Sequence, residues 1–163
     1  MTKLKIGVIG IGRIGKVHIA TLVQSVPQAE VLAVADIDLN SARQVAENFG
    51  IMSVTDHPDE IIANKEIDAV AICSSTDTHA RFIIEAAKAG KHIFCEKPVD
   101  LSISVIQDSI DTTSRAGVKL MPGFNRRFDP NFMKLRQLVS EGEVGDPHIL
   151  KITSRDPAPP PAK

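Results

Sequence analysis

The sequence has little cysteine, no excess of basic charge and no long apolar run, and each shortage excludes a class of protein. Cys73 and Cys95 are the only cysteines among 163 residues, and they lack the CxxC or metal-ligand spacing of a redox or zinc site. Both end apolar runs, so we expect reduced, buried thiols and no metal centre. With 19 basic and 20 acidic residues, the formal net charge of −1 argues against a surface for nucleic acid or an anionic membrane.

No segment approaches the roughly 18 uninterrupted apolar residues that a membrane span needs. The first five residues run directly into a strand pattern and include no small-residue cleavage site, so we expect no secretory signal. Together with the cysteine usage, this indicates a cytoplasmic protein. The hydrophobic content of 43% and charged content of 24% are typical of globular proteins, and the length suits one ordinary domain.

Short apolar runs alternate with amphipathic stretches, which predicts an α/β fold. The runs are continuous rather than alternating, as in a parallel sheet covered on both faces. The predicted strands are residues 4–9, 31–35, 69–73, 92–95 and 119–121, with a weaker one near 52–54. The predicted helices are residues 13–26, 39–49, 58–64, 79–89, 102–116 and 131–140. Strict alternation predicts right-handed crossovers and a Rossmann doubly wound parallel sheet with flanking helices.

The character of the sequence changes after Gly145. Residues 148–154 are predicted to form a strand with no helix behind it, and residues 157–163 contain four prolines, which exclude a helix or a central strand there. We therefore expect a Rossmann domain over residues 1–145. Residues 146–163 are then a strand and a proline-rich arm leading to a second domain that this sequence does not include.

A glycine fingerprint follows the first predicted strand and opens the first predicted helix. Gly10, Gly12 and Gly15 have GxGxxG spacing, and Asp36 comes 21 residues after Gly15, at the end of the second strand. Gly10 is expected to allow a tight turn, Gly12 the close approach of a pyrophosphate, and Gly15 close helix–strand packing. The pyrophosphate is expected at the positive end of the helix that begins near Arg13. This context predicts a dinucleotide site, although a solvated aspartate is an alternative interpretation of Asp36.

Asp36 favours NAD over NADP as the cofactor. A carboxylate there can accept hydrogen bonds from the adenosine ribose hydroxyls, and it would repel a 2′-phosphate. Arg13 can reach a phosphate or lie in solvent, and the sequence leaves both open, whereas Ile14 is assigned to the cofactor-binding loop with the glycines. His18, one helical turn further on, is predicted to be a helix-surface residue.

Polar residues follow the predicted fourth and fifth strands, where ligands of doubly wound sheets collect. After the fourth strand, Ser74 and Thr76 are predicted to line the ribose and nicotinamide side of the cofactor. The alternative is an ordinary hydroxyl-rich loop in which Asp77 or Thr78 caps the next helix.

The tripeptide Glu96-Lys97-Pro98 follows the fifth strand. A lysine at the mouth of a cleft beside a bound nicotinamide is suited to acid–base chemistry, although its position alone is more typical of a surface lysine in a turn. Glu96 is predicted to orient Lys97 or to bind a ribose hydroxyl. After the sixth strand, Arg126 and Arg127 can bind substrate oxygens or hold the sheet edge, and both interpretations remain open.

These residues resemble the glucose–fructose oxidoreductase/inositol dehydrogenase family (Gfo/Idh/MocA), and within it the bacterial inositol 2-dehydrogenases. The stretches that carry the resemblance are residues 10–18, 74–79, 96–98, 123–129 and 152–157. The resemblance covers nearly the whole chain but only the first half of a typical member. Ser75 departs from the pattern, since relatives often have proline there.

The resemblance implies hydride transfer from a polyol or sugar hydroxyl, with myo-inositol as the type of substrate, to NAD. It implies that Lys97 is catalytic and contacts the substrate, that Arg127 binds the substrate, and that His79 and Glu96 lie along the cofactor. The family also uses an aspartate–histidine pair that is expected beyond Lys163. The chain alone is therefore expected to bind NAD with little turnover, and the full-length form to be a homo-oligomer.

A second interpretation is a stand-alone NAD-binding module without catalysis. An enzyme assembled from two chains is intermediate between this module and a truncated enzyme. The proline-rich end favours a truncated enzyme. Shortly after the proline arm, an aspartate and a histidine a few residues apart would distinguish the enzyme from the module.

Overall fold

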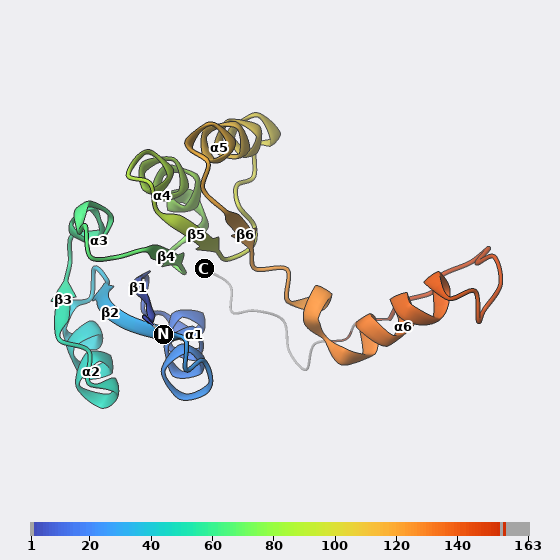
Figure 1. Cartoon of the computed structure of the whole chain (residues 1–163), viewed down its shortest axis with the longest axis horizontal. Helices are drawn as coiled ribbons and strands as arrows, with labels where there is room; N and C mark the ends of the chain where they lie inside the picture. The colour runs from blue at the N-terminus through green and yellow to red at the C-terminus, as the bar shows by residue number, and fades with distance from the viewer. Residues whose placement is uncertain (1, 154, 156–163) are drawn as a thin grey trace. The chain divides into compact units, whose positions relative to one another are not determined.

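The computed structural model describes residues 2–153 and residue 155, and the chain divides into two compact units, residues 1–124 and 125–163. In the first unit, strands and helices alternate from end to end (Figure 1). Its elements are β1 (Leu4–Ile9), α1 (Arg13–Ser25), β2 (Ala29–Ala35), α2 (Leu39–Phe49), β3 (Ser53–Thr55), α3 (Pro58–Ala63), β4 (Ala69–Ile72), α4 (Thr76–Lys88), β5 (His92–Cys95), α5 (Ile103–Ala116) and β6 (Leu120–Pro122). None of the helices in the described part of the chain is long and apolar enough to cross a membrane.

The six strands form one parallel sheet in the order β3-β2-β1-β4-β5-β6. The chain starts in the middle of the sheet at β1, builds outward through β2 and β3, and then returns to the other side of β1 with β4. Strand order therefore reverses between β1 and β4, which is where doubly wound sheets bind ligands at the carboxyl ends of their strands. This topology confirms the predicted Rossmann fold.

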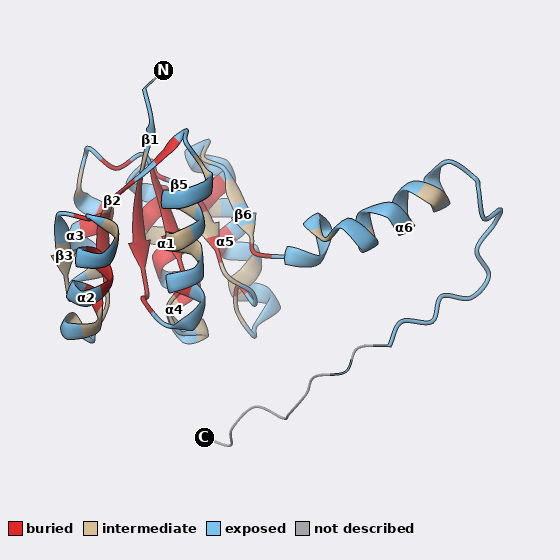
Figure 2. Ribbon diagram, turned by 90° about the horizontal axis from the view of Figure 1, so that it is seen from below, coloured by how far each residue is buried: buried red, intermediate tan, exposed pale blue. Residues whose placement is uncertain are grey.

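Two apolar clusters cover the two faces of the sheet, because successive side chains of a strand point to opposite faces. On β4, Val70 and Ile72 join the cluster that α3, α4 and α5 cover, whereas Ala69 and Ala71 join the cluster that α1 and α2 cover. Buried residues gather in the strands and on the inner sides of these helices (Figure 2). Burial on both faces explains why the strands are continuous apolar runs in the sequence.

The loop before α4 differs from the prediction. The helix begins at Thr76, three residues earlier than expected, with Ser75 as its N-cap residue, so Asp77 and Thr78 lie in the first turn instead of capping it. The Thr78 hydroxyl donates to the carbonyl oxygen of Ser75 at 2.7 Å, which closes this turn early. The start of the helix is thereby brought next to the end of β4.

The second unit contains a 3₁₀ turn, η1 (Asn125–Phe128), and the helix α6 (Pro130–Ser140). Asp129 caps α6 by accepting hydrogen bonds from the backbone N–H groups of Asn131 and Phe132. The strand predicted over residues 148–154 is contradicted: residues 148–153 form neither helix nor strand, and residue 154 lies outside the described residues, as do 156–163. A strand needs a neighbour to pair its backbone groups, and no described segment supplies one here.

Lys91 is a buried cation at the opposite end of the sheet from the strand carboxyl ends. The residue is only 6% exposed, and its Nζ donates hydrogen bonds to the carbonyl oxygens of Asn64 at 2.6 Å and Ile67 at 2.7 Å. Burial lowers the pKa of Lys91, and the charge of Asp68 partly opposes this. The lysine thus ties the start of β5 to the loop between α3 and β4.

Lys91→Met should lower the free energy of unfolding by about 2 kcal/mol, because the carbonyl oxygens of Asn64 and Ile67 lose a charged donor while the apolar stem is kept. Urea denaturation followed by circular dichroism measures the change. Lys88→Met, at an exposed position of α4, is the matched control and should change stability by less than about 0.5 kcal/mol. Equal stability of the two variants would contradict a structural role for Lys91.

Candidate functional site

A cleft of about 510 Å³ opens at the carboxyl ends of β1, β2 and β4. Most of its lining comes from three segments: the glycine loop between β1 and α1, the residues at the end of β2, and the loop between β4 and α4 with the first residues of α4. These segments are far apart in sequence, and the parallel sheet places their strand ends side by side. The cleft thus lies at the point where strand order reverses, as the sequence predicted.

The glycine loop packs too tightly for side chains at two of its three glycines. Gly10 has a φ of 94°, a left-handed conformation that favours glycine, and a Cβ there would collide with the backbone at Cys73 and Ser74. A Cβ on Gly15 would collide with the carbonyl oxygen of Gly10. Gly12 is different, since apart from its immediate chain neighbours no described residue comes within 4 Å of the position its Cβ would take. The space beside Gly12 is open to a ligand.

The amino end of α1 faces this open space with uncompensated positive polarity. Gly12 is the N-cap residue and offers no side-chain acceptor to the first N–H groups, and the first turn contains no acidic residue. Free N–H groups and the helix dipole together attract an anion. Arg13 is exposed at the start of the helix and lines the cleft with Ile14, so it can reach a bound phosphate.

Asp36 connects the end of β2 to the glycine loop. One oxygen of its carboxylate accepts the backbone N–H of Ile11, and the other accepts the N–H of Asp38 at 2.9 Å. Asp38 in turn caps α2 by accepting the N–H of Ser41. The carboxylate therefore holds the loop in place and lines the cleft at the same time. Asp36 is half-buried, and both of its carboxylate oxygens accept backbone N–H groups.

The loop after β4 supplies hydroxyl groups to the cleft. Ser74, Ser75 and Thr78 line it, and the hydroxyls of Ser74 and Thr78 lie 2.7 Å apart. Thr76 and His79, which the sequence assigned to the cofactor, are not among the lining residues. His79 is 1% exposed, with Nε2 3.0 Å from the carbonyl oxygen of Ser74 and Nδ1 2.8 Å from that of Pro98.

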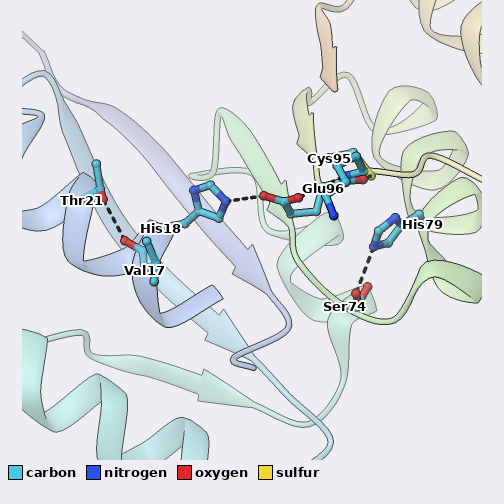
Figure 3. A network of polar contacts seen from close by, with 8 residues as sticks. Val17, His18, Thr21, Ser74, His79, Cys95 and Glu96 are labelled. Carbon is cyan, nitrogen blue, oxygen red and sulfur yellow. Dashed lines mark hydrogen bonds and ion pairs between the residues drawn. The ribbon is translucent and has the colours of Figure 1, made fainter. Parts of the chain in front are cut away.

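Glu96 and Lys97 follow β5, the next strand along the same edge of the sheet. Nε2 of His18 on α1 lies 2.8 Å from Oε1 of Glu96, and Figure 3 shows the two side chains pointing toward each other. Oε2 of Glu96 accepts the backbone N–H of Lys97 at 3.1 Å. The Lys97 side chain is exposed, and its ammonium makes no hydrogen bond to the described part of the chain. Contrary to the prediction of a helix-surface residue, His18 has a side chain only 28% exposed.

The two cysteines are buried at the ends of β4 and β5, and Cys73 lines the cleft. Burial raises the pKa of the Cys73 thiol to about 12, with the charge of Glu96 adding to the effect. Burial also raises the pKa of Cys95 to about 12, assisted by Cys73 and Glu96. Both thiols are free and buried, as predicted, and both stay protonated at neutral pH. In the described residues, no group of three or more histidine, cysteine or acidic side chains is placed to hold a metal ion.

Half of the twelve predicted site residues line the cleft. Gly10, Gly12, Arg13, Ile14, Asp36 and Ser74 line the cleft. Gly15 lies beneath the loop, and Arg127 belongs to the second unit, in η1. The sequence analysis missed Ile37, Pro58 and Phe82 in the lining. For Ile37, its position directly after Asp36 at a strand end was a usable signal.

Comparisons with known proteins agree with this geometry. The family model described as an oxidoreductase family with an NAD-binding Rossmann fold, Gfo/Idh/MocA, matches residues 4–124. The chain is 46% identical over 158 residues to the myo-inositol 2-dehydrogenase of Thermotoga maritima, and the match covers 97% of this chain and 47% of that protein. The chain thus spans about half the length of the curated relatives it matches.

Solved structures of similar sequence have the same fold. A probable dehydrogenase from Thermotoga maritima aligns with a TM-score of 0.92 at 47% identity, covering 97% of this chain and 47% of that one. A scyllo-inositol dehydrogenase from Lactobacillus casei with bound NAD(H) and scyllo-inositol aligns with a TM-score of 0.85 at 32% identity, covering 89% and 43%. The chain belongs to the Gfo/Idh/MocA oxidoreductase family, and residues 4–124 form its NAD-binding Rossmann fold.

Proposed function

We propose that this chain is the NAD-binding part of an oxidoreductase that transfers a hydride from a hydroxyl of an inositol-like polyol to NAD. The observation that carries the proposal is the cleft between Gly12, the amino end of α1 and Asp36, which has the shape and polarity that a dinucleotide needs. The relatives named as inositol dehydrogenases support the substrate class.

The cleft offers a separate partner to each part of the cofactor. The pyrophosphate lies against the N–H groups of α1 and beside Arg13, and the adenosine ribose hydroxyls bind Asp36. Ile37, which is 94% exposed and lines the cleft, provides an apolar wall for the adenine. Ser74 and the neighbouring loop lie on the nicotinamide side, and in this proposal Thr76 and Glu96 complete that end, while His79 is buried behind the loop and supports it.

Lys97 is proposed as the residue that takes part in proton transfer from the substrate hydroxyl. Its ammonium is exposed and uncommitted within the described chain, and it follows β5, the strand paired with β4. Arg127 is proposed to bind the substrate. We further propose that the Rossmann domain extends to residue 145, that the protein is cytoplasmic and binds neither nucleic acid nor membrane, and that the full-length enzyme is a homo-oligomer.

Gly12→Ala should weaken NAD binding at least about tenfold while leaving the fold intact. The added methyl group meets no atom of the described chain, so stability should fall by less than about 1 kcal/mol, the cost of replacing glycine by alanine at an N-cap. The methyl group would instead occupy the space where the pyrophosphate approaches the backbone. Isothermal titration calorimetry with NAD and thermal unfolding measure the two effects.

Gly15→Ala is the matched comparison, because its methyl group would collide with the carbonyl oxygen of Gly10. This variant should lose stability as well as affinity. If Gly12→Ala bound NAD as tightly as the unchanged chain, the proposed cofactor position would be refuted.

The chain should bind NAD at least about tenfold more tightly than NADP. Asp36→Asn should narrow that ratio, because it lowers the affinity for NAD and removes the repulsion that opposes NADP. The physical reason is repulsion between the Asp36 carboxylate and a 2′-phosphate. Asp108→Asn, an exposed position on α5, removes the same charge and should leave the ratio unchanged. Calorimetric titrations with both cofactors test this, and tighter binding of NADP by the unchanged chain would contradict the assignment.

Lys97→Met should lower kcat for myo-inositol oxidation at least about a hundredfold and leave NAD affinity within about threefold. The measurement is NADH formation by the protein from the whole reading frame that contains these residues. Lys88→Met removes an exposed lysine from α4 and should keep full activity. An undiminished kcat in Lys97→Met would show that Lys97 takes no part in the reaction.

A further inference from the structure

We propose that His18 and His79 are positioning residues that hold the backbone on the two sides of Lys97. His18 acts through the carboxylate of Glu96, the residue before Lys97, and His79 acts through the carbonyl oxygen of Pro98, the residue after it. The importance of this arrangement for catalysis rests on the proposed role of Lys97, but the arrangement itself can be tested without turnover.

The His18 branch is a relay of two hydrogen bonds. From α1, Nε2 of His18 bonds one oxygen of Glu96, and the other oxygen accepts the N–H of Lys97. The imidazole ring is fixed by an edge contact with Phe94, with ring centroids 4.8 Å apart. The Glu96 side chain is only 14% exposed, and its carboxyl atoms lie 3.2 Å from where a Cβ on Gly123 would be. The carboxylate is therefore enclosed on the Gly123 side, and in this proposal the hydrogen bond from His18 determines which oxygen faces the Lys97 N–H.

The His79 branch joins two loops directly. Its ring lies at the start of α4 with both nitrogens within hydrogen-bond distance of carbonyl oxygens, Pro98 on one side and Ser74 on the other. Figure 3 shows the contact with Ser74, the loop that lines the cofactor cleft. A carbonyl oxygen can only accept, so a neutral ring, with one N–H, donates to one of the two carbonyls. The proposal requires the hydrogen bond to Pro98.

The two branches meet at the segment from Glu96 to Pro98. Lys97 and Pro98 are exposed, whereas the two histidines come from helices that cover opposite faces of the sheet. His18 is on α1, which carries the pyrophosphate end of the cleft, and His79 is on α4, behind its nicotinamide side. Both helices therefore set the position of the Lys97 backbone relative to the cofactor. The two histidines thus position the Lys97 backbone without contacting the substrate.

The role of His18 is tested by the chemical shift and solvent exchange rate of the Lys97 amide proton in the ¹⁵N-labelled chain, without cofactor. His18→Leu removes the donor, so the Lys97 amide proton should move upfield and exchange with solvent about tenfold faster, the loss of one modest hydrogen bond. His18→Gln places an amide donor near the position of Nε2 and should restore most of the shift and protection. His57→Leu, at an exposed histidine, is the control and should change nothing at Lys97.

His79 is tested by two variants that each keep one of its contacts. His79→Asn places an amide near the position of Nδ1 and keeps the Pro98 contact, while His79→Gln places it near Nε2 and keeps the Ser74 contact. The Lys97 and Val99 amides should shift in His79→Gln and stay close to wild type in His79→Asn. The Ser75 amide should show the reverse pattern. Sheet amides such as those of Val8 and Val34 report whether each variant is folded.

An unchanged Lys97 amide in His18→Leu would overturn the His18 branch, and the same amide unchanged in a folded His79→Gln would overturn the other. If both His79 variants unfold, the proposal is decided by the His18 variants. In that case, failure of His18→Gln to restore the Lys97 amide shift and protection would show that His18 only packs against its neighbours. NAD titration of the same samples tests the proposed function separately from the positioning role of the two histidines. A chain that failed to bind NAD would refute the proposed function while leaving the amide results readable.

Discussion

The parallel pairing of β1 with β2 on one side and β4 on the other is the constraint on which the rest of the structure depends. Because both neighbours run in the same direction as β1, three loops leave the sheet at one edge. Each loop then leads into a helix, so helix amino ends collect there with their positive polarity. The cleft, the open space beside Gly12 and the position of Asp36 are consequences of this pairing. A hydrogen bond from Ile11 to Asp36 locks the first two loops together.

Local features of the site could be predicted from the sequence because their causes are local. The three glycines are set by the contacts of one turn, and Asp36 is identified by its distance from them and its place at a strand end. The strands were predictable because burial on both faces leaves continuous apolar runs. The strand predicted over residues 148–154 failed for the complementary reason: an apolar pattern describes one segment, whereas a strand also requires a partner.

The contacts that place Lys97 could not be predicted, because they join residues far apart in the chain. His18 and Glu96 are 78 residues apart, and their contact depends on how α1 lies across β5. His79 shows the same difficulty: the family resemblance assigned it to the cofactor, but the structure buries it in α4 between two carbonyl groups. Lys91, about which the sequence offered no prediction, is buried where its ammonium donates to two carbonyl oxygens more than twenty residues away in the chain. Polar side chains are placed by tertiary partners that periodicity does not reveal.

The cleft at the switch point of the sheet is proposed to bind NAD, and an NAD titration of the ¹⁵N-labelled chain, followed by amide chemical shifts, tests this most directly. We expect large, saturable shifts at Gly12, Ile14, Ile37 and Ser74, which line the cleft, and small ones on α5. Shifts concentrated away from those residues, or no saturable shift at millimolar NAD, would contradict it.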